Sequence, residues 1–232
     1  MFGLKNIKQN ATKTKFEDSA KNPTSDYLEV NNWEISEFIC SILVPIAGVH
    51  PFPVGELQLI TAATCYFKPK AIFEWGTHIG KSARIFYEIA KAFDIDAVVH
   101  SVDLPDELEH VEHPGETRGS MVKGLEGVKL YQGDGVNKSI SLCKEMNLKG
   151  SEVLFFVDGD HSYESVTREL MEIYSNYPDA AILLHDTFLQ SEDSNYNIGP
   201  YKAVREFLEK HTEYKSIKTE TGLPGMTLIY KK

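Results

Sequence analysis

The amino-acid sequence predicts an α/β fold: a doubly wound, seven-stranded sheet that is mostly parallel, with an antiparallel C-terminal hairpin and a helical N-terminal extension. Three observations support this prediction. Strand-like and helix-like segments alternate from residue 70 onward, glycines stand at the first strand-to-helix crossing, and two strand-like runs near the C-terminus are separated by a short turn. Alternation of this kind is typical of parallel strands joined by right-handed helical crossovers.

Short apolar runs mark the predicted strands, and apolar residues at helical spacing mark the helices between them. We expect parallel strands at residues 71–75, 97–102, 128–132, 153–157 and 180–185. We expect the helices of this region at about residues 81–93, 136–147, 161–175 and 200–210. The runs 214–218 and 226–230 flank a turn that contains glycine and proline, so they can pair as a hairpin at the sheet edge.

The first 69 residues are organised differently. Residues 1–30 are polar and mixed in charge, which predicts an arm that is disordered or packed on a partner. Residues 31–69 carry two helical patterns on either side of a break at residues 50–53, where two prolines occur. We expect this extension to cover part of the sheet, the mouth of a cofactor site or a subunit interface. In the last case the protein would be a homo-oligomer.

Composition excludes several classes of protein. The chain has 232 residues, of which 42% are hydrophobic, which is enough for one large domain with a substantial core. A net charge of −10 argues against a broad electrostatic grip on nucleic acid or on an anionic membrane. The first residues lack the apolar core of a signal peptide, and the apolar run 38–49 is too short to span a bilayer. Three scattered cysteines without metal-ligand spacing indicate a reduced, cytoplasmic setting.

The first strand-to-helix crossing is the most informative motif. Glu74 ends the strand, Gly76 and Gly80 follow, and Ser82 opens the helix. Glycines let the backbone approach a ligand closely, and a helix N-terminus offers free N–H groups. We therefore expect these four residues to bind a nucleoside-type cofactor. His78, inside the loop, is either a further cofactor contact or a solvated side chain.

The next two strands also end in acids. Asp103 follows the second strand, where a carboxylate can accept both ribose hydroxyls of an adenosine. Alternatively, Asp103 caps the turn before Pro105. The third strand ends in Gly133 and Asp134, which we expect beside the adenine unless they form a plain turn.

The fourth and fifth strands end in titratable residues that we expect side by side at one edge of the sheet. Asp158 and His161 follow the fourth strand, and His185 and Asp186 follow the fifth. Two neighbouring carboxylates need a cation or a shared proton, and hard oxygen ligands suit Mg²⁺, with Mn²⁺ or Ca²⁺ as alternatives. Asp160, by contrast, can act simply as a helix cap.

Together these motifs resemble those of the class I S-adenosylmethionine-dependent methyltransferases. FEWGTHIGKS resembles the glycine loop of that family, VDLP its ribose acid, and FVDGDHSY with LLHDT its active-site edge. The chain is most similar to small-molecule O-methyltransferases with a DGDHSY segment, which include sugar O-methyltransferases and cephalosporin hydroxylase-like proteins. The resemblance to catechol-type O-methyltransferases is more distant. The similarity covers about residues 55–232.

The resemblance implies a Rossmann-like fold over residues 70–232, S-adenosyl-L-methionine as cofactor, and methylation of a small-molecule hydroxyl. It also implies that Asp158 and Asp186 bind Mg²⁺ or Mn²⁺ and that His161 is the general base. The family often places two adjacent ligands after strand five, whereas Asp186 is flanked here by His185 and Thr187. Either flank could complete the metal site, and His185 is also a rival base.

Three other functions compete with this interpretation. A phosphate-binding loop is the nearest, but it needs four residues between its glycines, and here there are three. A nicotinamide dehydrogenase would need a tighter glycine spacing. A non-catalytic cofactor-binding or scaffold protein of the same fold is the third.

Two loops at the same edge of the sheet are candidates for substrate contacts, because loops there carry specificity in such folds. Residues 104–124, with His110 and His113, could be a lid that carries Arg118 toward substrate, or a mobile surface loop. Residues 188–200 are the second candidate, with Asp193, Tyr196 and Asn197.

Overall fold

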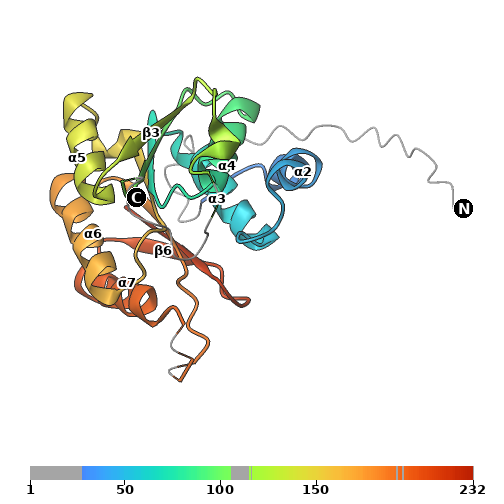
Figure 1. Cartoon of the computed structure of the whole chain (residues 1–232). Coiled ribbons are helices and arrows are strands. Elements are labelled where there is room, and N and C mark those ends of the chain that lie inside the picture. Colours follow the sequence, from blue (N-terminus) through green and yellow to red (C-terminus); the bar gives the residue numbers. More distant parts are fainter. Residues whose placement is uncertain (1–27, 106–114, 116, 192, 195, 232) are drawn as a thin grey trace, which may run out of the picture.

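A seven-stranded sheet of order β3-β2-β1-β4-β5-β7-β6 runs through the described part of the protein (Figure 1). The computed structural model describes residues 28–105, 115, 117–191, 193–194 and 196–231. The histidines His110 and His113 and most of the polar N-terminal arm lie outside these residues. The strands are β1 Ala71–Trp75, β2 Val98–Asp103, β3 Val128–Gln132, β4 Val153–Val157, β5 Ala181–His185, β6 Lys215–Lys218 and β7 Met226–Tyr230.

Strand direction follows the prediction. The first five strands are parallel to one another, whereas β7 is antiparallel to both β5 and β6. The predicted fold class is therefore confirmed, and each strand begins and ends within one residue of its expected bounds. The strands β1, β4 and β5 are buried along their whole length, as is typical of parallel strands with helices on both faces.

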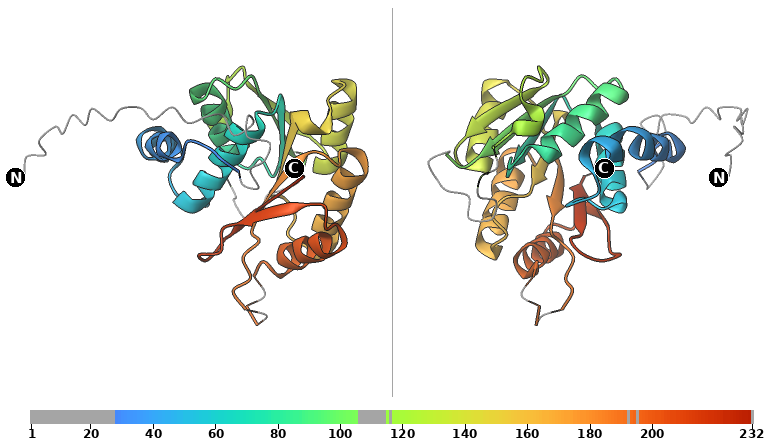
Figure 2. Two further views of the ribbon diagram at one scale, coloured as in Figure 1. Left: turned by 180° about the vertical axis from the view of Figure 1, so that it is seen from behind. Right: turned by 45° about the vertical axis from the view of Figure 1, so that its right-hand side comes forward.

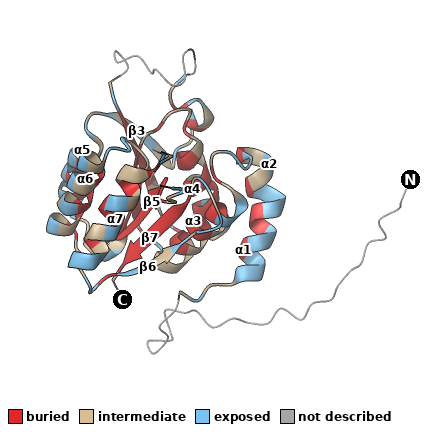
Figure 3. Ribbon diagram, turned by 90° about the horizontal axis from the view of Figure 1, so that it is seen from below, coloured by how far each residue is buried: buried red, intermediate tan, exposed pale blue. Residues whose placement is uncertain are grey.

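Helices cover both faces of the sheet (Figures 2 and 3). The N-terminal helices and α4 share one hydrophobic core with one face of the strands, while α5, α6 and α7 share the core on the other face. The helices are α1 Asn32–Phe38, the π-helical turn η2 Ile39–Leu43, α2 Val44–Ala47, α3 Val54–Phe67, α4 Lys81–Ala92, α5 Gly135–Glu145, α6 Tyr163–Asn176 and α7 Ile198–Lys210, with short 3₁₀ turns η3 Ser120–Val122 and η4 Gly150–Glu152.

The helical N-terminal extension packs on the sheet rather than standing apart from it. Leu57 and Ile60 of α3 are fully buried in the same core as Ile72 of β1 and Leu228 of β7. The extension thus covers one face of the sheet, which was one of its expected roles. The domain boundary at residue 70 and the homo-oligomer stay predictions.

Strand register brings the ends of the central strands to one level. Trp75, the last residue of β1, is level with Val102 of β2 and Val157 of β4, and Val157 is level with Leu184 of β5. The residues that follow these strands therefore meet at the same edge of the sheet. None of the helices in the described part of the chain combines the length and the apolar character that a membrane span requires.

His100 on β2 is a buried histidine within the sheet. Its side chain stacks on Phe73, with ring centroids 4.7 Å apart, and its Nδ1 lies 3.1 Å from the hydroxyl of Tyr131. Burial lowers the pKa of His100 to about 4, because an imidazolium would lose its hydration, and the charge of Lys129 adds to this effect.

We expect this histidine to make stability fall as pH drops from about 6.5 to 4, because the unfolded chain then binds a proton that the folded protein does not. At pH 5 the loss should amount to about 2 kcal/mol. Urea unfolding of the wild type and of His100→Phe at pH 7.5 and pH 5 measures it. An equal pH dependence of the two proteins would contradict the assignment.

Candidate functional site

A cavity of about 830 Å³ opens at the edge of the sheet where β1, β2, β4 and β5 end. It is walled by the N-terminal loop before α3, by the first residues of α5 and α6, and by the loop between β6 and β7. Nine of the predicted catalytic, cofactor-binding and metal-binding residues line it: Gly76, His78, Asp103, Gly133, Asp134, Asp158, His161, His185 and Asp186. Glu74, Gly80 and Ser82 lie outside the lining.

Gly76 allows the main chain of β1 to pass very close to that of β4. Its φ is +95°, and a Cβ built on it would lie 2.0 Å from the carbonyl oxygen of Asp158. A glycine is therefore required here by the protein's own backbone and not only, as the sequence suggested, by a ligand. This contact sets the position of Asp158 relative to the glycine loop.

Glu74 and Ser82 support the glycine loop from inside the protein. Glu74 is 1% exposed and accepts a hydrogen bond from the hydroxyl of Ser101 at 2.5 Å, and the nearby Ser82 hydroxyl also favours its charged form. Burial raises the pKa of Glu74 to about 7. Gly80, with a φ of +86°, packs against Val122. Direct cofactor contact by Glu74, Gly80 and Ser82 stays a prediction.

Asp103 ties the glycine loop to the end of β2. Its carboxylate accepts hydrogen bonds from the backbone N–H of His78 at 3.0 Å and of Leu104 at 2.7 Å. The Nε of Arg118 lies 3.2 Å from the same carboxylate, and this guanidinium also donates to the carbonyl of Leu104. Arg118, a candidate substrate contact by sequence, is thus held at the opposite end of the cavity from His161.

The turn between β3 and α5 closes that end of the cavity. The N–H of Gly133 donates to the carbonyl of Asp103, while Asp134 caps α5 by accepting from the N–H of Asn137 and forms an ion pair with Arg168 at 2.8 Å. Trp75 fills the space beneath, because a Cβ on Gly135 would lie 2.4 Å from its ring.

Sequence reasoning missed the α6 wall of the cavity. Ser165, Arg168 and Glu169 line it, and their spacing of three and four residues places them on one face of the helix. That polar spacing was visible in the sequence. Glu169 is only 3% exposed, and burial raises its pKa to about 7.

Asp158, His161 and Asp186 form a cluster at the other end of the cavity. One oxygen or nitrogen atom from each lies within 4.8 Å of the others, which suits a metal ion. Asp186 has a left-handed backbone, with φ of +57°, and its buried Oδ1 has no hydrogen-bond partner among the described residues. A strained residue with an unsatisfied carboxylate oxygen is a feature of binding sites. Asp160, by contrast, bonds to Ser162, the N-cap of α6.

Two histidines face this acid pair and differ in their exposure. The Nε2 of His161 lies 3.3 Å from Asp186 and 3.8 Å from Asp158, and its side chain is 47% exposed. The side chain of His185 is 3% exposed, with Nδ1 3.0 Å from Asp158 and Nε2 3.0 Å from Glu56. His161 is therefore accessible to a substrate, whereas both nitrogens of His185 are engaged by the protein.

The pKa values of the two histidines follow from these contacts. The nearby carboxylate of Asp158 raises the pKa of His161 above its ordinary value, although burial opposes this shift. Burial alone would lower the pKa of His185, but the charge of Asp158 and hydrogen bonds to Asp158, Asp186 and Glu56 raise it well above its ordinary value.

The loop 188–200 contributes one residue to the cavity wall. Tyr196 lines the cavity, and the charge of Asp186 raises the pKa of its phenol. The side chain of Asn197 donates to the carbonyl of Pro224 at 2.7 Å, and its contact with substrate stays a prediction. Asp193 is not among the lining residues.

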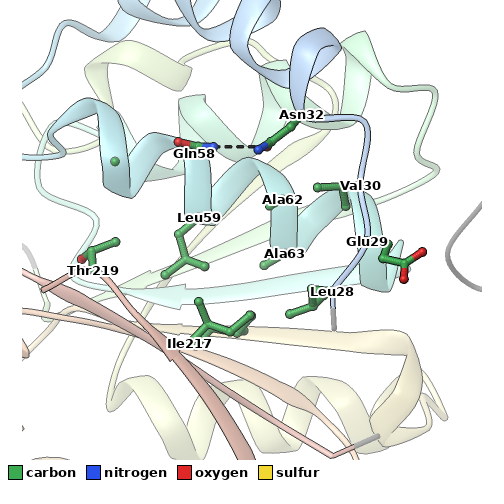
Figure 4. Close-up of a pocket in the computed structure, with 12 residues that line it drawn as sticks. Leu28, Glu29, Val30, Asn32, Gln58, Leu59, Ala62, Ala63, Ile217 and Thr219 are labelled. Atoms are coloured by element: carbon green, nitrogen blue, oxygen red, sulfur yellow. Dashed lines mark hydrogen bonds between the residues drawn. The ribbon is translucent and has the colours of Figure 1, made fainter. Parts of the chain in front are cut away.

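A second cavity, of about 580 Å³, lies between α3 and the β6–β7 hairpin (Figure 4). Leu28, Leu59 and Ile217 give it an apolar lining, and the side chain of Gln58 donates to Asn32 at its rim. Because its lining contains no cluster of acids and histidines, it offers none of the chemistry of the first cavity.

Comparison with known proteins gives a family assignment that agrees with the residues of the first cavity. The family model described as Rhamnosyl O-methyltransferase/CmcI matches residues 54–227, which is well over half of the chain. The match begins at the start of α3, inside the helical extension. No curated protein matches the chain.

Solved structures of O-methyltransferases share the fold. TomG from Streptomyces achromogenes, in complex with SAM, is 15% identical, with a TM-score of 0.57 over 87% of this chain and 96% of that one. The O-methyltransferase from Bacillus cereus, in complex with SAH, is 13% identical, with a TM-score of 0.56 over 92% and 97%. CalS11, a TDP-rhamnose 3′-O-methyltransferase, is 14% identical, with a TM-score of 0.52 over 84% and 86%.

These structural likenesses show the fold, and the family match carries the assignment. The resemblance to O-methyltransferases that the motifs indicated is confirmed. The chain belongs to the Rhamnosyl O-methyltransferase/CmcI family.

Proposed function

We propose that this protein transfers a methyl group from S-adenosyl-L-methionine to a hydroxyl of a small molecule, with the assistance of Mg²⁺ or Mn²⁺. One observation carries the proposal: Asp158, His161 and Asp186 converge at one end of a cavity whose other end is framed by Asp103, with Gly76 between them. The activity of CalS11 on TDP-rhamnose supports a sugar as the acceptor.

The residues at the Asp103 end fit an adenosine. The Asp103 carboxylate lies in the cavity wall beside the glycine loop, where it can accept the ribose hydroxyls. Gly133 and Asp134 line the wall next to it and are proposed to face the adenine. The sulfonium methyl is already activated, so the main task of the chain is to align acceptor oxygen, methyl carbon and sulfur.

The residues at the other end fit a divalent cation. Asp158 and Asp186 supply oxygen donors, and the Nδ1 of His185 lies 3.0 Å and 3.3 Å from them. At these distances His185 could join the two carboxylates as a ligand, and His161, whose ring also lies within reach of both, is the alternative third ligand. Such an ion lowers the pKa of a hydroxyl that reaches it.

His161 is the proposed general base, because its side chain is 47% exposed and its Nε2 lies beside the acid pair. A substrate hydroxyl held there can pass its proton to Nε2 as the methyl group arrives. The carboxylates of Asp186 and Asp158, 3.3 Å and 3.8 Å from this nitrogen, are proposed to orient the ring. Tyr196, Leu223 and Pro224 line the same cavity and are proposed to contact the acceptor.

The cofactor assignment predicts the effect of a substitution at Gly76. Gly76→Ala should destabilise the protein by about 1–3 kcal/mol more than Gly124→Ala, because its new Cβ meets the Asp158 backbone. Gly124 is the matched control, since its φ is +82° and nothing lies within 4 Å of its Cβ position. Urea unfolding measures this difference in stability. Calorimetry measures whether Gly76→Ala also binds S-adenosylhomocysteine more weakly than Gly124→Ala does. Equal S-adenosylhomocysteine affinity in the two variants would remove the glycine loop from cofactor binding.

The metal assignment predicts that activity depends on a divalent cation. Release of S-adenosylhomocysteine from S-adenosylmethionine, with a panel of nucleotide sugars and phenols as acceptors, should stop with EDTA and return with Mg²⁺ or Mn²⁺. Asp158→Asn and Asp186→Asn should each retain cofactor binding and lose turnover. Full activity after exhaustive chelation would exclude metal assistance. Cofactor binding without turnover of any acceptor would favour a non-catalytic protein.

The base assignment predicts a different phenotype for each histidine. His161→Ala should lower kcat by at least about a hundredfold, with S-adenosylhomocysteine affinity and thermal stability nearly unchanged, because the residue is half exposed. His185→Ala should lose both stability and cation affinity, because it removes a buried partner of two carboxylates. Full turnover in His161→Ala would show that another group takes the proton.

A further inference from the structure

Glu56 lies on α3, in the N-terminal extension, yet its side chain reaches the catalytic edge of the sheet. The residue is 3% exposed, and its Oε2 lies 3.0 Å from the Nε2 of His185. Its second oxygen, Oε1, accepts a hydrogen bond from the N–H of Gly225 at 2.8 Å. A buried carboxylate with both oxygens engaged is held firmly in one position.

The ring of His185 is fixed by contacts at both nitrogens and on its faces. Its Nδ1 points to Asp158 and Asp186, at 3.0 Å and 3.3 Å, while Nε2 points to Glu56. Phe52 packs against the ring, with centroids 4.7 Å apart, and Phe156 lies at 6.5 Å. The ring can therefore neither flip nor tilt without breaking one of these contacts.

A carboxylate accepts hydrogen bonds but cannot donate one when ionised. Facing Glu56, the Nε2 of His185 must therefore carry a proton. Without a cation, Nδ1 faces the carboxylate of Asp158 and by the same rule carries a proton as well. A cation bound by Asp158 and Asp186 would replace the Nδ1 proton, and the proton held on Nε2 would then leave the Nδ1 lone pair directed at that cation. A carboxylate behind a metal-bound histidine has this effect in many metal sites.

We propose that Glu56 is a positioning residue of the active site: it holds the proton on Nε2 of His185 and thereby directs Nδ1 at Asp158 and Asp186. This proposal deepens the proposed metal-assisted function and rests on it where cation affinity is concerned. It makes α3 part of the catalytic apparatus and not only a cover for the sheet.

The same carboxylate also positions a wall of the cavity. Gly225, which donates to Glu56, follows the cavity-lining Leu223 and Pro224, and its carbonyl accepts from the N–H of Thr187. Glu56 thus links α3, the end of β5 and the loop before β7. A substitution at Glu56 could act through either bond, so the experiment must separate them.

The test uses Glu56→Gln in the full chain, with Glu88→Gln as the matched control. Glutamine offers one acceptor oxygen, so it cannot serve both the Gly225 N–H and a protonated Nε2. Glu88 is likewise a buried glutamate, on α4, but it pairs with Arg84 outside the cavity. Three quantities are measured: the ¹⁵N shifts of His185, Mn²⁺ affinity by calorimetry with S-adenosylhomocysteine present, and S-adenosylhomocysteine affinity itself.

In the wild type and in Glu88→Gln, the ¹⁵N shifts should report a proton on Nε2 of His185. In Glu56→Gln that signature should change and Mn²⁺ affinity should fall by about 10–100-fold, while S-adenosylhomocysteine affinity changes less than about twofold. Unchanged His185 shifts together with unchanged Mn²⁺ affinity in Glu56→Gln would overturn the proposal. If the wild type itself binds no Mn²⁺, metal assistance fails, and the ¹⁵N shifts alone decide the role of Glu56.

A double-mutant cycle separates positioning from a purely structural role through Gly225. Glu56→Gln and His185→Asn are combined, and Mn²⁺ affinity is measured for each single variant and for the pair. If Glu56 acts through His185, the double variant should be little worse than His185→Asn alone. Additive losses would show that Glu56 acts through the Gly225 loop, and would overturn the proposal.

Discussion

The backbone contact between Gly76 and the carbonyl of Asp158 is the constraint on which the site depends. A Cβ at residue 76 would lie 2.0 Å from that oxygen, so only glycine lets the ends of β1 and β4 approach this closely. Because strand register already sets the two ends level, the contact joins the glycine loop to the acid cluster. Both ends of the cavity therefore share one rigid support, in which a methyl donor and an acceptor can be aligned.

Charge compensation around His185 is the second constraint. Asp158, Asp186 and Glu56 would repel one another if they surrounded an apolar residue, and burial would make that repulsion severe. A histidine with hydrogen bonds at both nitrogens relieves this repulsion without filling the cavity. His161 shares the acid pair but stays half exposed, so it remains accessible to an acceptor molecule. The two histidines of this cluster thus have different roles, because His185 is buried and His161 is half exposed.

The sequence by itself determined the architecture and the strand-end residues. Strands such as Val153–Val157 are short apolar runs, and the helices between them show helical periodicity, so local pattern was enough to locate both. The parallel arrangement followed from their alternation, and this arrangement alone requires Asp158 and Asp186 to lie at one edge of the sheet. The two aspartates could be placed together from the sequence because neighbouring parallel strands bring their carboxyl ends to the same edge.

Only the tertiary structure decided how these residues are supported and which of them are reachable. Glu56 and His185 are 129 residues apart, and Glu56 and Gly225 are 169 apart, so no local pattern connects them. The sequence favoured His161 as the base and left His185 as a rival, and their exposures of 47% and 3% support that order. It left Arg118 either on a lid over the substrate or in a mobile surface loop, and only the structure pairs its guanidinium with Asp103. Burial and side-chain pairing depend on packing between distant segments, which periodicity and spacing do not encode.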